Sequence, residues 1–199
     1  MNEFSIVCRI LGSLFYRAPQ ETVLDPLFAL LTDGKLKQHW PLEQDDLLER
    51  MVQGLDRNVL EADYQVMFAA DGSVPPYGSA YNGAGEMATR AFLTQCGMPL
   101  TDAPADHFGL LLLAASWIED HALESDEVLA QLALFDDYLL SWCGRFLGKV
   151  EAHATSVFYR TLSIVTREAL QAMYDELSEI NADSTDNHAD NDGIDAVDE

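Results

Sequence analysis

The chain has 199 residues, 48% of them hydrophobic, which is enough to bury the core of one sizeable domain. It carries 34 aspartates and glutamates against 11 lysines and arginines, a formal net charge of -23 at pH 7. A charge of this sign disfavours nucleic acid and anionic membrane surfaces as partners and favours a basic one, although it can equally serve solubility alone.

The three cysteines, Cys8, Cys96 and Cys143, are odd in number and widely spaced. They form neither a CxxC pair nor a disulfide framework, so a reducing cytoplasm is the expected compartment. The N-terminus lacks a basic segment followed by an apolar one, and the longest near-apolar run, residues 108–118, is too short to span a bilayer. We therefore expect a soluble cytoplasmic protein that is not itself exported and does not insert stably into a membrane.

Apolar residues in the first part of the chain recur with the period of an amphipathic helix. The first stripe lies within residues 4–16 and ends before Pro19, Asp25-Pro26 predicts a capped helix start, and Gly34 predicts its stop. Two further stripes follow before Asp71-Gly72. The stripe residues expected in the core are Phe4, Val7, Cys8, Leu11, Leu14, Phe15, Leu47, Leu48, Met51, Val52, Leu55, Tyr64, Met67 and Phe68.

The helical pattern breaks between Ser73 and Gly85, where prolines, glycines and two tyrosines follow one another closely. No helix can cross such a segment, so it is predicted to be a long loop. Loops of this length inside compact domains tend to be functional or disordered. The run Val74-Pro75-Pro76 and the two tyrosines favour an ordered loop.

Helical periodicity resumes over residues 86–96 and stops at Gly97. Pro104 is expected to open the next helix, whose face carries His107, Leu110, Leu111, Ala114, Trp117 and Ile118. Ser125, followed by two acids, is expected to cap the helix after that. A further stripe contains Tyr138, Leu139, Trp142 and Phe146.

The last long helix is predicted over residues 156–180. From Asn181 onward the chain has seven acids, no lysine or arginine and almost no large apolar side chains. Such a segment cannot bury enough surface to offset its ordering entropy. We therefore predict an all-α fold, with a single globular domain of about ten helices over residues 1–180 and an acidic disordered tail over residues 181–199.

Motifs for nucleotide, serine-hydrolase and zinc-protease chemistry (GxxxxGK[ST], GxSxG and HExxH) are absent. His121 with Glu119, Asp120 and Glu124 could supply metal ligands on one helical turn, but such a cluster is usually a solvated face, so neither a metal nor another cofactor is expected. Asp106-His107 is the best candidate acid/base pair. Adjacent helical residues point in different directions, and the alternative is a helix-start aspartate beside a partly buried histidine.

Three motifs together indicate a binding function. A helix end with Tyr64, Met67 and Phe68 leads into Pro75-Pro76-Tyr77-Gly78-Ser79-Ala80-Tyr81, and Asp106-His107-Phe108-Gly109 follows about two dozen residues later. Aromatic rings on a proline-stiffened loop offer contact area with little rotamer entropy to lose, which suits a peptide-binding groove. An aspartate at its rim would suit a basic ligand.

At these motifs the sequence resembles the TorD/DmsD family, cytoplasmic chaperones of molybdenum-cofactor redox enzymes that are exported by the twin-arginine pathway. The resemblance covers nearly the whole chain, from Phe4 to about Leu177, and looks nearest to the DmsD branch, which serves dimethyl sulfoxide reductase. It also includes the segments Leu14-Phe15-Tyr16-x-Ala18-Pro19, Gln38-x-Trp40-Pro41-Leu42 and Phe158-Tyr159-Arg160-x-Leu162. Relatives usually carry acids where this chain has Ala103 and Ala105.

The resemblance implies a single all-helical domain that is no enzyme. It implies binding of the twin-arginine leader of the apo catalytic subunit of a molybdoenzyme, which delays export until the cofactor is inserted. The peptide-binding residues it implies are Tyr64, Met67, Phe68, Pro75, Pro76, Tyr77, Gly78, Ser79, Tyr81, Asp106 and His107. A monomer is expected, with a domain-swapped dimer as the alternative, and a small helical enzyme using Asp106 and His107 is the alternative function.

Overall fold

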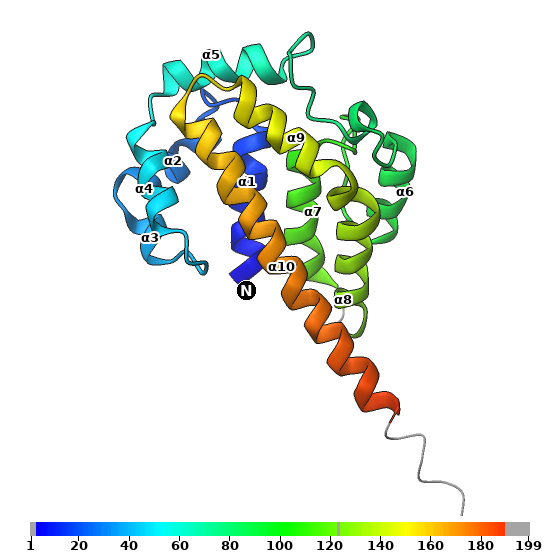
Figure 1. The fold of residues 1–199 in the computed structure, drawn as a ribbon. Coiled ribbons are helices and arrows are strands. Elements are labelled where there is room, and N and C mark those ends of the chain that lie inside the picture. Colours follow the sequence, from blue (N-terminus) through cyan, green and yellow to red (C-terminus); the bar gives the residue numbers. More distant parts are fainter. Residues whose placement is uncertain (1–2, 123, 190–199) are drawn as a thin grey trace, which may run out of the picture.

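The computed structural model describes residues 3–122 and 124–189, and in these ranges the chain folds into one all-helical domain (Figure 1). This part of the chain contains no strand, and its β-type pairing is a single isolated antiparallel bridge between Tyr77 and His107. The predicted all-α fold is confirmed. No helix within the described ranges is both long and apolar enough to cross a membrane.

The elements follow one another with short connections, apart from the segment between α5 and α6 and the one between α6 and α7. Their bounds are α1 Glu3–Tyr16, η1 Thr22–Leu24, α2 Asp25–Thr32, α3 Lys35–Gln38, α4 Asp45–Gln53, α5 Arg57–Phe68, η2 Gly78–Tyr81, α6 Glu86–Gln95, α7 Phe108–His121, α8 Glu124–Ala133, η3 Leu134–Leu139, α9 Leu140–His153 and α10 Val157–Ala189.

Helices α1 and α7 pack closely against each other at a pair of glycines. A Cβ on Gly12 would lie 2.8 Å from the Gly109 carbonyl oxygen, and a Cβ on Gly109 would lie 2.7 Å from the Gly12 carbonyl oxygen. No side chain fits at such distances, so glycine is required on both helices. This explains Gly109 in the Asp-His-Phe-Gly motif by packing.

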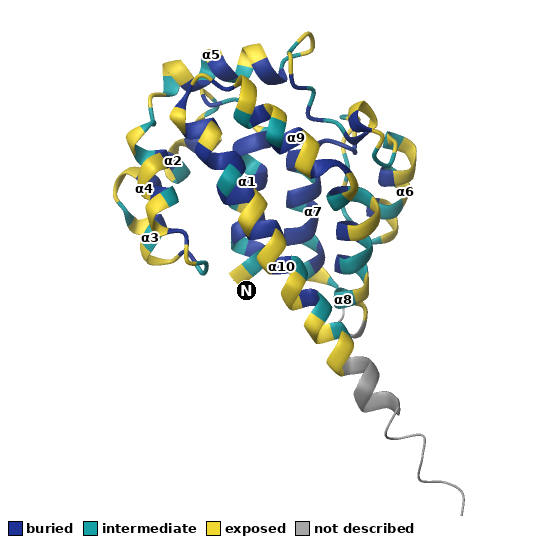
Figure 2. Ribbon diagram, viewed as in Figure 1, coloured by how far each residue is buried: buried dark blue, intermediate teal, exposed yellow. Residues whose placement is uncertain are grey.

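The core lies behind α10, which runs diagonally across the face shown in Figure 1 and packs against α4, α8 and α9. Figure 2 shows the buried residues gathered along α1, α7, α9 and the inner side of α10. Aromatic rings join these elements: Phe108 lies 5.0 Å from Phe15 and 4.7 Å from Phe146 between ring centroids, and Phe68 lies 5.7 Å from Tyr159. The hydrophobic stripe residues predicted from periodicity lie in or against this core, apart from Leu110 and Trp117, which are only half-buried.

Helices α8 and α9 are joined by the π-helical segment η3 without a break in the helical path. The chain changes direction there, as Figure 1 shows. Inserted π-turns bend helices in this way. The bend buries Leu134, Phe135 and Leu139, so the whole unit wraps around the core.

Three predicted helix starts differ from the structure. Asp25 is the first residue of α2 rather than its cap, because Leu24 is already helical, and its carboxylate pairs with Arg57. Pro104 does not open α7, which begins at Phe108 because the backbone at His107 is extended and pairs with Tyr77. Helix α8 begins at Glu124, so Ser125 lies within its first turn.

The end of the last helix also differs from its expected position. Helix α10 continues past 180 to Ala189, since adding residues to an existing helix requires no new nucleation. Residues 190–199 of the predicted disordered tail lie outside the described residues, and disorder of the tail stays a prediction.

Candidate functional site

The long loop after α5 is fastened to the start of α7 by backbone hydrogen bonds. The Phe108 amide donates to the Pro76 carbonyl oxygen at 2.7 Å, and the Gly78 amide donates to the Asp106 carbonyl oxygen at 2.9 Å. These bonds form the bridge between Tyr77 and His107. The structure therefore brings the two motifs together, and residues 73–85 form an ordered loop.

Asp106 completes this attachment with its side chain. It is 2% exposed, and its Oδ2 accepts a hydrogen bond of 2.9 Å from the Ser79 amide. A buried carboxylate that holds a backbone amide is a structural group. The geometry therefore places Asp106 beneath the loop rather than at a rim that faces a basic ligand.

His107 is the N-cap of α7. Its Nδ1 accepts a hydrogen bond of 3.0 Å from the Gly109 amide, which assigns the proton of the neutral ring to Nε2. Burial lowers the pKa of His107 to about 4, although the Asp106 charge opposes this shift. The imidazole is thus neutral at pH 7, and its nitrogen nearest the helix is already engaged. Asp106 and His107 have separate partners and do not form an acid/base dyad.

Several of the predicted site residues are buried, either in the loop itself or at the end of α5. They are Met67, Phe68, Pro76, Gly78 and Tyr81. The Tyr81 ring stacks on the Trp142 ring at 5.6 Å, and burial raises the pKa of Tyr81 to about 12. A Cβ on Gly83 would lie 2.5 Å from Trp142 Cδ1, so this loop has little room for side chains where it crosses α9.

Three half-buried tyrosines, Tyr16, Tyr64 and Tyr77, form what we call the tyrosine surface. The His107 ring lies 4.9 Å from the Tyr16 ring and 5.3 Å from the Tyr77 ring, edge to face in both cases. The Tyr64 hydroxyl lies 3.5 Å from the Tyr16 carbonyl oxygen. The end of α1, helix α5 and the loop thus contribute one ring each.

Tyr16 was not among the predicted site residues. Its sequence signal is its place at the end of the first helix, within the segment Leu14-Phe15-Tyr16-x-Ala18-Pro19 that the resemblance includes. Helical periodicity does not indicate a neighbour 91 positions away in the chain. Of the remaining predicted residues, Pro75 is half-buried and Ser79 is exposed. Each lies two positions from Tyr77 on the loop.

Charged groups flank the tyrosine surface. Burial raises the pKa of Tyr64 to about 12, and the nearby charges of Glu21 and Glu61 add to the shift. The Arg17 guanidinium carbon lies 5.3 Å above the Tyr16 ring, and Arg17 also pairs with Glu21 at 3.3 Å. A guanidinium between an aromatic face and a carboxylate is therefore already present at this edge.

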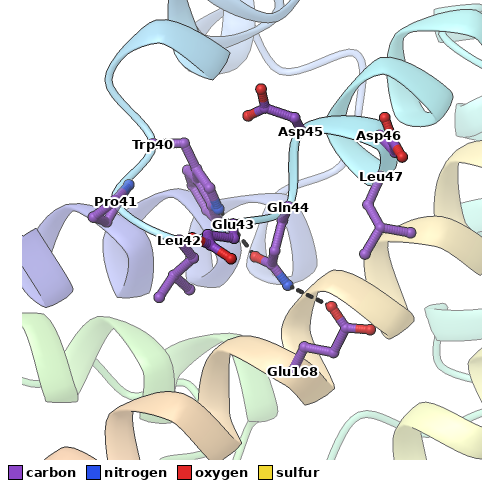
Figure 3. A pocket seen from close by; sticks show the side chains of 9 residues that line it. All are labelled: Trp40, Pro41, Leu42, Glu43, Gln44, Asp45, Asp46, Leu47 and Glu168. Atoms are coloured by element: carbon purple, nitrogen blue, oxygen red, sulfur yellow. Dashed lines mark hydrogen bonds between the residues drawn. The ribbon is translucent and has the colours of Figure 1, made fainter.

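A second candidate is an open pocket of about 730 Å³ at the Trp-Pro-Leu segment (Figure 3). Trp40 Nε1 donates to Gln44 Oε1 at 3.0 Å, and Gln44 Nε2 donates to Glu168 Oε2 at 3.1 Å. The pocket is lined by Trp40, Pro41, Leu42, Glu43, Gln44, Asp45, Asp46, Leu47 and Glu168. Lys37, which does not line the pocket, neutralises part of its negative charge by pairing with Asp45 at 3.3 Å.

Neither candidate has the arrangement of a catalytic or metal site. Within the described ranges, no three His, Cys, Asp or Glu side chains are grouped so that they could hold a metal ion. In the cluster considered from sequence, the Asp120 carboxylate pairs with Arg9, and the His121 ring stacks on Trp117 at 3.6 Å. His121 Nδ1 lies 3.0 Å from the Trp117 carbonyl oxygen.

Comparison with known proteins assigns the family. The family model for the nitrate reductase delta subunit matches residues 35–148. Chaperone protein YcdY of Escherichia coli is 58% identical over 181 residues, covering 90% of this chain and 98% of that protein. The Tat proofreading chaperone DmsD of Salmonella typhimurium is 29% identical over 185 residues, covering 85% and 88%.

An uncharacterized protein of Haemophilus influenzae is 42% identical over 183 residues, covering 90% of this chain and 97% of that protein. Identity is higher with YcdY than with DmsD, so the dimethyl sulfoxide reductase client expected from the DmsD branch stays a prediction. The named relatives are chaperones, not enzymes. The chain belongs to the nitrate reductase delta subunit family and is a redox-enzyme maturation chaperone of the TorD/DmsD type.

Proposed function

We propose that the protein binds the twin-arginine leader of the apo catalytic subunit of a molybdenum-cofactor reductase, and that the tyrosine surface is the contact. Binding in the cytoplasm would delay export of the client until its cofactor is inserted. The observation that carries the proposal is the half-buried group of Tyr16, Tyr64 and Tyr77, with the charges of Glu21 and Glu61 near Tyr64, in a chain related to a Tat proofreading chaperone.

The chemistry of the surface suits both parts of such a leader. A leader joins a basic segment to a moderately apolar one. Tyrosine rings offer apolar faces at a low entropy cost, and an arginine can stack on a ring while its fork pairs with a carboxylate. Arg17 on Tyr16 and Glu21 adopts this arrangement within the chain itself.

The proposed roles of the sequence-predicted residues divide by exposure. Tyr64, Tyr77 and the neighbouring Pro75 and Ser79 would contact the peptide. The buried residues, with Asp106 and His107, would hold the loop in position. The arginines would then pair with Glu21 and Glu61, and the dimethyl sulfoxide reductase subunit is the proposed client by relation to DmsD.

Titration calorimetry with a leader peptide and its twin-lysine variant tests the proposal. Tyr77→Ala should weaken binding by about 2 kcal/mol, roughly thirtyfold, as loss of an aromatic anchor does. Tyr138→Ala is the matched control, because this half-buried tyrosine stacks on Phe92 at 4.5 Å instead of contacting His107. Equal losses in the two variants, or no binding of either peptide at high micromolar concentration, would contradict the proposal.

A further inference from the structure

A narrow slot opens between α1, α7, α8 and α10, at the opposite ends of α1 and α7 from the tyrosine surface. Its volume is about 50 Å³. The residues that line it are Phe4, Cys8, Ala115, Glu119, Glu127, Val128, Gln131, Phe135, Met173, Glu176, Leu177 and Ile180. A single water needs about 10–15 Å³ of such space, so the slot has room for one small polar group and a short stem.

The polar groups of the slot are hydrogen-bond acceptors. Glu119 Oε1 and Gln131 Oε1 are buried and have no hydrogen-bond partner in the described part of the chain. Gln131 is 5% exposed, and its amide nitrogen is already used by the Ala115 carbonyl oxygen at 2.8 Å, which fixes the amide oxygen as the free group. Unsatisfied buried acceptors are costly, so a donor is required here.

Apart from the protonated form of a carboxyl group, the described lining residues supply no such donor. They include no lysine, arginine or histidine, and the Cys8 thiol is directed to Met173 Sδ at 3.6 Å. Glu119, Glu127 and Glu176 contribute three carboxyl groups from three helices. The walls between them are apolar, with Phe135 and Met173 each 1% exposed. The slot therefore matches a group that is positively charged, donates several hydrogen bonds and is carried on an aliphatic stem.

We propose that this slot binds the side chain of a lysine from a protein partner, with the ammonium group on Glu119 and Gln131 and the methylene stem against Phe135 and Met173. An ammonium group is compact and has three donors, whereas the planar guanidinium group has five and needs more width. The slot shares no residue with the tyrosine surface, so a test of one proposed site does not decide the other.

The ionisation of Glu119 gives the proposal a second signature. Burial raises the pKa of Glu119 to about 7, and Glu127 of α8, Asp120 of α7 and Glu176 of α10 add to the shift. The charge of the N-terminal ammonium group opposes the shift. The other groups here are Arg9 of α1, which pairs with Asp120, and the Cys8 thiol, whose pKa is raised by burial and by Glu119. Because an ammonium needs the ionised carboxylate, affinity should rise roughly tenfold from pH 6 to pH 8.

Two pairs of probes test the slot, each compared by NMR of the Met173 and Ala115 methyl groups. n-Butylammonium is paired with butan-1-ol, and N-acetyl-lysine methylamide is paired with N-acetyl-norleucine methylamide. The charged member of each pair should bind at least tenfold more tightly and shift both methyl signals. Binding of butylammonium without the lysine derivative would refute a protein side chain as the ligand, and equal binding of the charged and neutral probes would refute the site.

Isosteric variants give an independent result. Glu119→Gln should lower the affinity for butylammonium at least tenfold and abolish its pH dependence. Glu176→Gln, which changes an exposed carboxylate at the mouth, should lower it about threefold. Glu179→Gln, an exposed change on α10 outside the slot, is the control and should leave the affinity unchanged. Unaltered affinity in both Glu119→Gln and Glu176→Gln would overturn the proposal.

Discussion

Asp63 is the charged side chain whose removal should damage the fold most. It is 4% exposed on α5, yet its carboxylate receives the Thr155 amide at 2.9 Å, the Thr155 hydroxyl at 2.9 Å and the Ser156 amide at 2.8 Å. These donors precede the first turn of α10, where the helix dipole also favours a negative charge. Burial of the carboxyl group opposes ionisation, but these hydrogen bonds prevail and lower the pKa of Asp63.

Asp63→Ala leaves two amides without an acceptor and removes the charge at the start of α10. An unsatisfied buried donor costs about 1–3 kcal/mol, and loss of a cap costs about 1 kcal/mol, so the variant should lose about 3 kcal/mol of stability. At roughly 2–4 °C per kcal/mol for a chain of this size, Tm should fall by about 6–12 °C. Asp63→Asn keeps one acceptor and should lose about half as much.

Thermal unfolding followed by circular dichroism at pH 7 measures the effect, with the exposed Asp102→Ala as the matched control. The lowered pKa of Asp63 determines the direction in which its stabilising effect changes with pH. The stabilisation by Asp63 is present above the unfolded-state pKa and is lost as the pH falls through the lower native value. The Tm difference from wild type should therefore shrink below about pH 4. A Tm loss at pH 7 no larger than that of the control would refute the reasoning.

Two further predictions concern acid stability and the C-terminus. Because the pKa of His107 is about 4 in the folded chain against 6.5 in its ordinary state, stability should fall by about 2 kcal/mol from pH 7 to pH 5 through this residue. His107→Asn, which retains a capping side chain, should lessen the pH dependence of urea unfolding, and an unchanged dependence would contradict the burial argument. Truncation after Ile180 should leave Tm nearly unchanged, whereas a drop of more than roughly 5 °C in a thermal scan would show that the removed segment packs on the body.

Helical periodicity was sufficient to predict the all-α fold, and the prolines and tyrosines of residues 73–85 were sufficient to predict an ordered loop, because both features depend on local patterns. The positions of the helix starts were harder to predict from the sequence, since the first turn of α7 depends on the pairing of His107 with Tyr77. The partner of Asp63 lies 92 positions away, which no local pattern indicates. Glycine is likewise required at position 109 because of the close contact with Gly12 on another helix.

The motif segments named from the sequence lie together in the structure, whereas their role in binding a peptide stays a prediction. The motif residues were all expected to contact a peptide, whereas in the structure Asp106 is buried under the loop and the Tyr81 ring is buried against Trp142. Exposure depends on which face of the loop meets the core, and a sequence motif does not carry this information. Tyr16 was missed for the same reason, because only the packing of α1 on α7 brings it beside His107.

Photo-crosslinking tests the central claim most directly. A twin-arginine leader peptide with a photoreactive residue beside the arginine pair would be irradiated with the intact protein, and the linked residues would be identified by mass spectrometry. The account predicts crosslinks within residues 57–68 and 73–81, around Tyr64 and Tyr77, that disappear with Tyr77→Ala. Crosslinks confined to residues 40–47 and Glu168, at the acidic pocket of Figure 3, would contradict it.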